Sequence, residues 1–374
     1  MRILIAPDKF KDSLGAEAVG QAIARGIGAA WPAAQLEIVS LADGGEGTAE
    51  AIRRARDGEW IDCRAHDALG RAMACRYAWL TRQRLAVMEM SAVAGFAALA
   101  PNERAPVRAS TFGVGEMLRC AADRGAREII VGLGGSATND GGFGMARALG
   151  FRFLDETGRE LTGSVSDLLK LAQIESPNDL ALPAIIAACD VNNPLLGPDG
   201  ATCTFGPQKG ASAEELEVLE RSLARLAQVT ARTLQHDHSA TPGAGAAGGL
   251  GFGLLGFGRA QVRSGFDVVA EAIDLRAKIR QADIVITGEG KLDRQTLSGK
   301  TPAGVARMAR AEGKPVCAIV GQATDDAEVR GLFDNVMALN DGSPDYRETA
   351  RLLETRAHDF ATHWRGRDGI ITGE

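Results

Sequence analysis

The fold can be predicted outward from the segment REIIVGLGGSATNDGG, residues 127–142. The apolar run 129–131 predicts a buried strand, the glycines after it predict a turn, and a helix is expected to follow. Glycine lets a ligand approach the main chain closely, and a helix that begins beyond the turn directs N–H groups and its positive dipole end toward that ligand. Such a site suits phosphate. Asp140 lies in the same turn and would repel phosphate unless a cation lay between them.

The order strand, loop, helix recurs at both ends of the chain. The apolar segments 2–6 and 36–41 predict strands, each followed by a loop and a helix, and residues 283–287, 316–320 and 335–339 predict further strands. This order is typical of a parallel sheet with crossover helices, whose ligands bind beyond the carboxyl ends of the strands. Residues 60–64, 75–80 and 85–90 instead predict short antiparallel strands of another layer.

These patterns predict an α/β protein with two domains. One is a Rossmann-like, doubly wound parallel-sheet domain, and the other is an α/β domain inserted into it. The Rossmann-like domain is expected to be discontinuous and to contain residues 1–58, 109–155 and 275–374. Residues 59–108 and 156–274 are expected to form the inserted domain.

Composition excludes several classes of partner. The 374 residues are 45% hydrophobic and carry a net charge of −6, which argues against nucleic acid or an anionic membrane as a partner. No apolar stretch approaches the length of a transmembrane helix, and the N-terminal apolar run is too short for a signal peptide. The six cysteines contain no C-x-x-C pair and indicate neither a disulfide framework nor a zinc site. We therefore expect a cytoplasmic globular protein and leave open whether it forms a homo-oligomer.

Acidic residues recur at the expected strand ends, each beside a glycine, an amide or a lysine. They are Asp8 with Lys9, Asp43 with Gly44 and Gly45, Asp140 with Gly141, Asp190 with Asn192, and Glu289 with Lys291 and Asp293. Any one of them is equally well explained as a helix N-cap or a turn former. Together at one edge of a sheet they would suit Mg²⁺ with a polyphosphate, because Mg²⁺ takes oxygen ligands and bridges phosphate oxygens.

Two other functions are compatible with parts of this pattern. Gly132, Gly134 and Ala137 fit the dinucleotide fingerprint G-x-G-x-x-A, and Asp155 follows at a distance suited to a ribose, which would indicate a nucleotide-dependent oxidoreductase. Asp140 would then face a pyrophosphate, which argues against this interpretation. A non-enzymatic module that binds phosphate or senses sugar acids would need the glycine loops but no cluster of acids.

Seven segments point to one enzyme family. They are APDKFKDSL (6–14), ADGGEGT (42–48), GLGGSATNDGG (132–142), CDVNNPLLG (189–197), GPQKGAS (206–212), PGAGAAGG (242–249) and TGEGKLDRQTLSGKTPAGVA (287–306). Over essentially its whole length the chain resembles the type I glycerate kinase family, with Gly15 and Lys291 as minor departures. The resemblance implies ATP-dependent phosphorylation of D-glycerate, usually at the 2-hydroxyl, on a two-domain α/β fold with a Rossmann-like domain.

On this resemblance the acidic strand ends and glycine loops receive expected roles, with ATP and Mg²⁺ as cofactors and glycerate as the substrate. Asp190 is the expected base for the glycerate hydroxyl, with Asp43 behind it and Lys9 as a further catalytic residue. The expected nucleotide-binding residues are Gly134, Gly135, Ser136, Asn139, Gly288, Gly290 and Lys300. Asp8, Lys209 and Lys291 are expected to bind glycerate. Asp140, Glu289 and Asp293 are expected to hold Mg²⁺, directly or through water.

Overall fold

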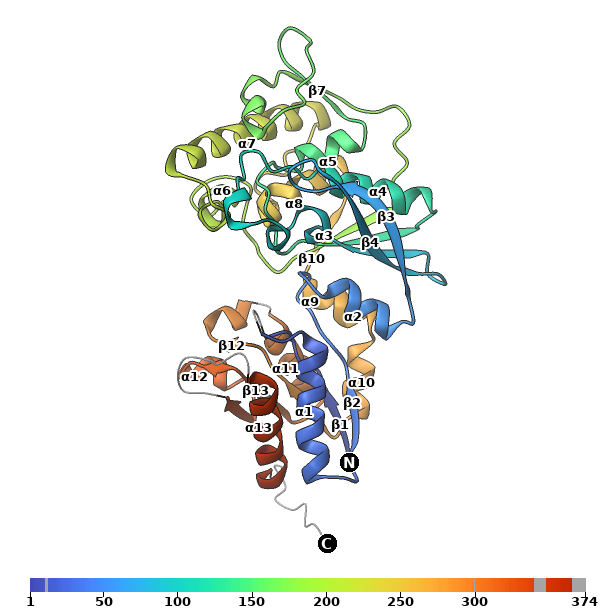
Figure 1. Ribbon diagram of the computed structural model, residues 1–374, viewed down its shortest axis with the longest axis vertical. Coiled ribbons are helices and arrows are strands. Elements are labelled where there is room, and N and C mark those ends of the chain that lie inside the picture. Colours follow the sequence, from blue (N-terminus) through green and yellow to red (C-terminus); the bar gives the residue numbers. More distant parts are fainter. Residues whose placement is uncertain (11–12, 299, 340–347, 365–374) are drawn as a thin grey trace. The chain divides into compact units, whose positions relative to one another are not determined.

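The protein divides into two compact units, of which the second is one continuous insertion into the first. The computed structural model describes residues 1–10, 13–298, 300–339 and 348–364. Residues 1–43 and 266–374 form unit 1, and residues 44–265 form unit 2 (Figure 1). The expected division differs, since it placed residues 44–58 and 109–155 with the chain termini and residues 266–274 in the inserted domain. The segment 109–155 belongs to unit 2 because its strand β6 (Glu128–Gly132) pairs on both sides with strands of that unit.

Unit 1 contains a five-stranded sheet in which every pairing is parallel. Its strands, in spatial order, are β2 (Gln35–Ile38), β1 (Arg2–Ile5), β11 (Ile284–Thr287), β13 (Val316–Val320) and β15 (Asn335–Ala338). In order along the chain this is 2-1-3-4-5, a doubly wound arrangement whose direction of winding reverses between β1 and β11. The predicted α/β class with a Rossmann-like parallel sheet is therefore confirmed.

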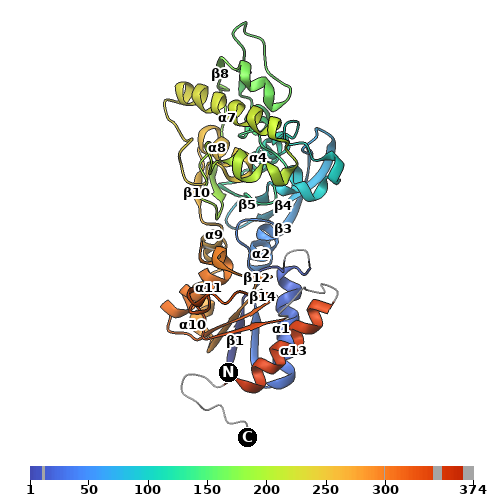
Figure 2. The ribbon, with the colours of Figure 1, turned by 90° about the vertical axis from the view of Figure 1, so that its left-hand side faces the viewer.

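Helices cover both faces of the unit 1 sheet. Helices α1 (Ala16–Ala30) and α13 (Thr349–His363) lie side by side on one face, while α10 (Leu275–Gln281) and α11 (Thr301–Ala311) cover the other (Figures 1 and 2). The close approach of α1 to α13 requires glycine at position 26, because a Cβ there would lie 2.1 Å from the carbonyl oxygen of Glu354. The shorter elements of this part of the chain are α9 (Gly265–Ala272), β12 (Lys291–Leu292), β14 (Gln322–Ala323) and α12 (Ala327–Arg330), with a 3₁₀ turn at Arg294–Ser298.

Unit 2 contains a six-stranded mixed sheet. Its strands, in spatial order, are β10 (Gln261–Arg263), β9 (Ala184–Ala188), β6, β5 (Leu85–Glu89), β4 (Ala72–Leu80) and β3 (Glu59–His66). The first four run parallel, whereas β4 is antiparallel to both of its neighbours, β3 and β5, so this part of the sheet has the antiparallel pairing that the sequence predicts. Because the four parallel strands share a direction, their carboxyl ends open onto one edge of the sheet.

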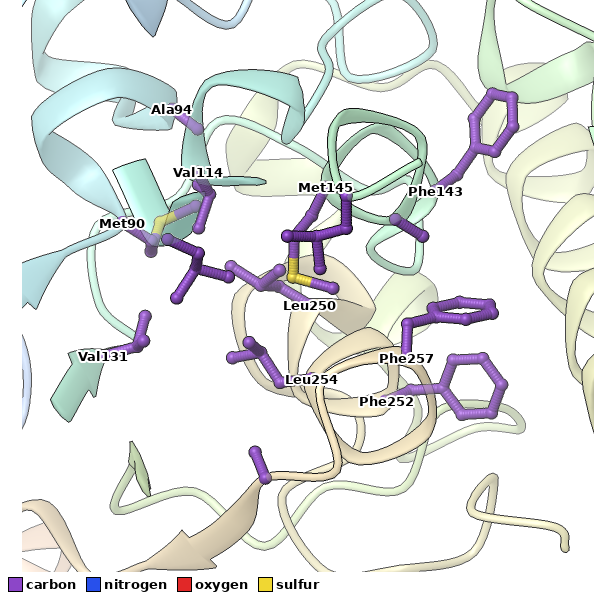
Figure 3. Close-up of a cluster of buried hydrophobic side chains, with 14 of the residues drawn as sticks. Met90, Ala94, Val114, Val131, Phe143, Met145, Leu250, Phe252, Leu254 and Phe257 are labelled. Carbon is purple, nitrogen blue, oxygen red and sulfur yellow. The ribbon is translucent and has the colours of Figure 1, made fainter. Parts of the chain in front are cut away.

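The opening segment has the predicted order of strand, glycine turn and helix. Strand β6 is followed by a ten-residue loop and by α5 (Phe143–Ala148), which packs into the main core of the unit. Met145 of α5 and Leu250 of α8 (Ala246–Phe257) point toward one another within that core (Figure 3). Within the described ranges, no helix is long and apolar enough to cross a membrane.

The remaining elements of unit 2 surround this core. They are α2 (Thr48–Ala55), α3 (Ser91–Ala94), α4 (Phe112–Asp123), β7 (Arg152–Leu154), β8 (Gln173–Glu175), α6 (Ala201–Phe205) and α7 (Ala213–Leu234), with 3₁₀ turns at Phe96–Ala98, Pro101–Glu103, Val165–Lys170 and Pro207–Lys209.

Candidate active site

The glycine loop after β6 presents unbonded backbone N–H groups. It is fixed by a hydrogen bond from the Phe96 N–H to the carbonyl of Gly135 (2.9 Å) and by one from the Ala137 N–H to the carbonyl of Ala94 (2.8 Å). Among the residues that the structure describes, the N–H groups of residues 134–136 donate no hydrogen bond. Gly135 has a φ of +68°, which side-chain-bearing residues rarely adopt. A fixed row of N–H groups of this kind suits an anion.

Two glycines of this loop make room for another part of the chain. A Cβ at Gly132 would lie 2.5 Å from the carbonyl oxygen of Gly44, and one at Gly134 would lie 2.6 Å from the Cα of Gly45. Both positions therefore need glycine because the segment 44–45 packs directly against them. The sequence alone predicts that these glycines admit a ligand, whereas in the structure they make room for the segment 44–45.

The buried carboxylate of Asp140 accepts hydrogen bonds from backbone N–H groups at the start of α5. Its carboxylate accepts hydrogen bonds from the N–H groups of Thr111 (2.8 Å), Gly142 (3.0 Å) and Gly144 (3.0 Å), and from the Thr111 hydroxyl (2.9 Å). The side chain is 1% exposed. Burial raises the pKa of Asp140, and the hydrogen bonds from Thr111 and Gly144 oppose that shift. The expectation that Asp140 holds Mg²⁺ disagrees with this geometry, since both oxygens are already bonded and the helix start already has its anion.

Lys209 lies beneath the glycine loop. Its Nζ donates to the Ser136 Oγ and to the Thr138 carbonyl, both at 2.7 Å, and the residue is 5% exposed. Burial lowers the pKa of Lys209 to about 7, although the negative charge of Asp140 acts against this. The Lys209 amino group therefore orients the Ser136 hydroxyl, and in its protonated form it adds positive charge under the loop.

Asp190 follows the strand that lies next to the strand before this loop. Strand β9 pairs with β6, so Asp190 extends from the same edge of the sheet as the loop. It is half-buried, and its Oδ1 accepts a hydrogen bond from the Gly265 N–H (2.8 Å).

Asn139 is fully buried and donates to the Thr202 hydroxyl (2.9 Å). This placement contradicts the expected contact between Asn139 and a nucleotide.

Glu89 is a functional candidate that the sequence pattern does not reveal. It ends β5, and its Oε1 accepts hydrogen bonds from the N–H groups of Gly47 (3.0 Å) and Ala49 (2.9 Å) at the start of α2. Glu89 thereby orients the segment 44–47, which packs against the glycine loop. It has the signal used for the other acids, a carboxylate at a strand end, but no glycine or lysine beside it.

In unit 1, two buried carboxylates lie where the winding of the sheet reverses. Asp8 follows β1, and its carboxylate accepts from the Thr301 hydroxyl (2.7 Å) and from the Lys9 N–H (2.6 Å). Glu289 follows β11, and its Oε1 accepts from the Thr296 hydroxyl (2.6 Å). Each acid is 8% exposed. Crevices at such reversal points are where doubly wound sheets bind ligands.

These acids repel one another. Burial and, after it, the negative charge of Asp43 raise the pKa of Asp8 to about 6. Burial also raises the pKa of Glu289 to about 7, with Asp8 and Asp293 adding to the shift and Lys300 opposing it. These charges act on one another across a short distance, and four of the five side chains are acidic, so their environment favours a cation. The five are Asp8, Asp43, Glu289, Asp293 and Lys300.

The neighbouring glycines and Lys291 differ in what they contact. A Cβ at Gly288 would lie 2.1 Å from the carbonyl oxygen of Ile319, so this glycine makes room for the chain at the end of β13. The Gly290 carbonyl accepts from the Gln322 N–H (3.0 Å). Lys291 pairs with Asp293 (3.4 Å), and its side chain is 60% exposed.

The carboxylates of unit 1 fit one way of binding Mg²⁺. Within the described ranges, no group of three or more His, Cys, Asp or Glu side chains is arranged to hold a metal. Mg²⁺ usually needs fewer protein ligands, because it keeps several waters and binds one or two carboxylates together with substrate phosphates. Asp8 and Glu289 match that second mode, since their mutual repulsion would be relieved by a divalent cation.

Comparisons with known proteins agree over nearly the whole chain. Residues 3–365 match the model of the Glycerate kinase family. A glycerate kinase of Bacillus subtilis strain 168 is 40% identical, covering 96% of this chain and 97% of its own, and a glycerate 2-kinase of Escherichia coli K12 is 42% identical, covering 88% and 87%. The crystal structure of a Salmonella typhimurium LT2 protein, provisionally named glycerate kinase 2, is similar with a TM-score of 0.84 and 40% identity, covering 96% and 97%.

Proposed function

The chain belongs to the glycerate kinase family, and from this premise we propose that it transfers the terminal phosphoryl group of ATP to the 2-hydroxyl of D-glycerate, giving 2-phospho-D-glycerate and ADP. Its relatives at about this level of identity carry the names glycerate kinase and glycerate 2-kinase. Phosphoryl transfer requires little covalent chemistry from the protein. It requires fixed positions for the reactants and compensation of the charge on the moving group.

The observation that carries the proposal is the loop 134–136 above Lys209. It combines three unbonded N–H groups, a hydroxyl held by a buried ammonium, and Asp190 at the neighbouring strand end. Glycerate carries a carboxylate beside the hydroxyl that reacts. We propose that the loop binds this carboxylate and that Ser136 donates to it. This changes the role expected from the sequence, in which the loop bound phosphate oxygens.

Asp190 is the proposed base. A base must lie within hydrogen-bond reach of the proton that it accepts, and Asp190 extends from the strand adjacent to the loop. The hydrogen bond from the Gly265 N–H occupies one carboxylate oxygen and fixes the direction of the group. The carboxylate fixed in this way is proposed to accept the proton of the glycerate hydroxyl as the hydroxyl oxygen attacks phosphorus.

Unit 1 is the proposed site of the nucleotide. Asp8 and Glu289 would hold Mg²⁺ together with the phosphates of ATP. Bound Mg²⁺ would neutralise part of the negative charge of the carboxylates and the phosphates. Thr301 and Thr296 orient the two carboxylates through the hydrogen bonds that their hydroxyls donate. Lys9 and Lys300 are the proposed cations near the phosphates. Asp43 raises the pKa of Asp8, which gives it an electrostatic role at the same site.

The oxidoreductase alternative loses its main support. Its fingerprint required Gly132 and Gly134 to admit a pyrophosphate, whereas both glycines pack against the segment 44–45. Asp155, the residue expected near a ribose, accepts hydrogen bonds from the N–H groups of Thr157 and Arg159 within its own turn.

A coupled assay for ADP release separates the candidate functions. We expect ADP release that depends on both D-glycerate and Mg²⁺, with no change in NADH fluorescence on addition of the protein. Ser136→Ala should raise the KM for glycerate more than the KM for ATP. A rise in the KM for ATP alone would show that the loop binds the nucleotide and not glycerate. Absence of glycerate-dependent ADP release would remove the proposed function. Cytoplasmic location is a further prediction, to be checked by cell fractionation.

A further inference from the structure

Three cysteines that are scattered in the sequence lie together on unit 2. Cys63 of β3 and Cys75 of β4 are direct partners in the antiparallel register, and Cys120 of α4 lies beside them. The Sγ atoms of Cys63 and Cys75 are 3.1 Å apart. A disulfide has an S–S distance of about 2.0 Å, so the two sulfurs need to approach by only about 1 Å. The pairing of the strands, and not the spacing in the sequence, brings them together.

The two thiols differ in exposure and in charge. Cys63 is half-buried, whereas Cys75 is 9% exposed. The hydrogen bond between the two thiols lowers the pKa of Cys75 and raises that of Cys63. Cys75 is therefore the sulfur on which the thiolate forms, and the thiolate is the reactive species in thiol oxidation.

We propose that Cys63 and Cys75 are a site of reversible oxidation, where a hydroperoxide converts the two thiols into a cross-strand disulfide. The Cys75 thiolate attacks a peroxide oxygen, the O–O bond breaks, and the departing oxygen takes a proton. The resulting sulfenic acid is attacked by the sulfur of Cys63, so that the S–S bond forms as the S–O bond breaks. With hydrogen peroxide, the two thiols are oxidised to one disulfide and the peroxide is reduced to two waters. A dithiol reductant reverses the reaction.

Cys120 is a less suitable partner. It approaches from a helix, and its Sγ lies 4.0 Å from the hydroxyl of Tyr77. Burial raises the pKa of Cys120, which keeps it protonated. No strand pairing fixes its sulfur opposite Cys63 or Cys75. The first disulfide is therefore expected within the β3–β4 hairpin.

The disulfide would affect stability. It closes the loop between residues 63 and 75, which restricts the unfolded chain and should raise the melting temperature of the oxidised protein. His66 and Asp67 lie inside that loop, whereas Asp190, Ser136 and Lys209 lie outside it. Oxidation should therefore leave the KM for glycerate unchanged.

Peptide mapping of the full chain tests the proposal. The protein is treated with hydrogen peroxide, its remaining thiols are alkylated, and it is digested with trypsin without reduction. Arginines at 56, 64, 71 and 76 place Cys63 in peptide 57–64 and Cys75 in peptide 72–76, while Cys120 lies in peptide 120–124. We expect a linked pair of 57–64 with 72–76, lighter by two hydrogens than the sum of the two peptides, and its disappearance after dithiothreitol.

Variants separate the proposal from general oxidation. Cys75→Ser and Cys63→Ser should each abolish the linked pair and the rise in melting temperature, whereas Cys203→Ser, at an exposed cysteine, should keep both. Three results would overturn the proposal: both thiols still open to alkylation when Cys203 is oxidised, sulfinic acid at Cys75 without a link, or a first link to peptide 120–124.

Discussion

Replacement of Asp140 by asparagine separates a structural role from a metal-binding one. Asp140→Asn keeps the size of the side chain but replaces one acceptor oxygen by a donor NH₂ group. In the wild type both oxygens face N–H donors, from Thr111, Gly142 and Gly144. The amide can satisfy only one side, and its NH₂ group must face an N–H group on the other.

The cost can be estimated from these contacts. A hydrogen bond to a charged acceptor contributes about 1.5–3 kcal/mol, and the variant loses one or two of them. Burial of a charged carboxylate is unfavourable, which is why burial raises the pKa of Asp140. The neutral amide avoids this cost, and this offsets part of the loss. We therefore expect the local stability of the start of α5 to fall by about 3 kcal/mol. Since about 1.4 kcal/mol corresponds to a factor of ten, amide exchange there should accelerate about a hundredfold.

Hydrogen exchange with residue-level fragmentation measures this directly at Gly142 and Gly144. Asp155→Asn is the matched control, because Asp155 also caps a turn but lies in an exposed one, so exchange in α5 should not change. Unchanged exchange at both glycines in Asp140→Asn, together with a weaker dependence of activity on Mg²⁺, would refute the structural role and restore Asp140 as a metal ligand.

Three further predictions concern the proposed roles of single residues. Asp190→Asn should lower kcat strongly while the KM for glycerate stays near its wild-type value, and near-normal turnover would remove Asp190 as the base. Lys209→Met should raise the KM for glycerate at least tenfold, since it removes the buried ammonium that holds Ser136, and an unchanged KM would contradict this. Glu289 binds its proton more tightly in the folded protein, so folding stability should fall as pH rises from 4.5 to about 7, by about 3 kcal/mol. Glu289→Gln should lose this part of the slope in thermal unfolding and keep the part that Asp8 contributes at lower pH, and an identical slope in both proteins would disprove the raised pKa of Glu289.

The sequence predicted local structure well because periodicity is a local property. The strands at 129–131, 283–287 and 316–320 and the antiparallel strands between residues 60 and 90 all appear close to their expected bounds. The division into units was harder to predict, because it depends on which strands pair. Strand β6 has the same pattern as a strand of unit 1, and only its pairing with β5 and β9 places it in unit 2.

The sequence indicates which residue types gather at the candidate site, but not which contacts each residue makes. Asp8, Asp190, Glu289 and Lys209 all lie at carboxyl ends of parallel strands or at the loops beside them. Asp140 was not distinguishable from them, because its partner Thr111 is 29 residues away. What distinguishes Asp140 is that its carboxylate is buried against three N–H groups of its own chain. A local pattern of glycine and aspartate does not reveal whether a carboxylate faces solvent or such N–H groups.

Phosphorus NMR of the reaction product tests the central claim most directly. The protein is incubated with ATP, Mg²⁺ and D-glycerate, and the spectrum is recorded without proton decoupling. Phosphorylation at the 2-hydroxyl predicts a new phosphomonoester signal split into a doublet by the single proton on carbon 2, appearing as ADP accumulates. A triplet would place the phosphate on the CH₂ group of carbon 3 and contradict the proposed product, and no new phosphomonoester signal would contradict the proposed reaction itself.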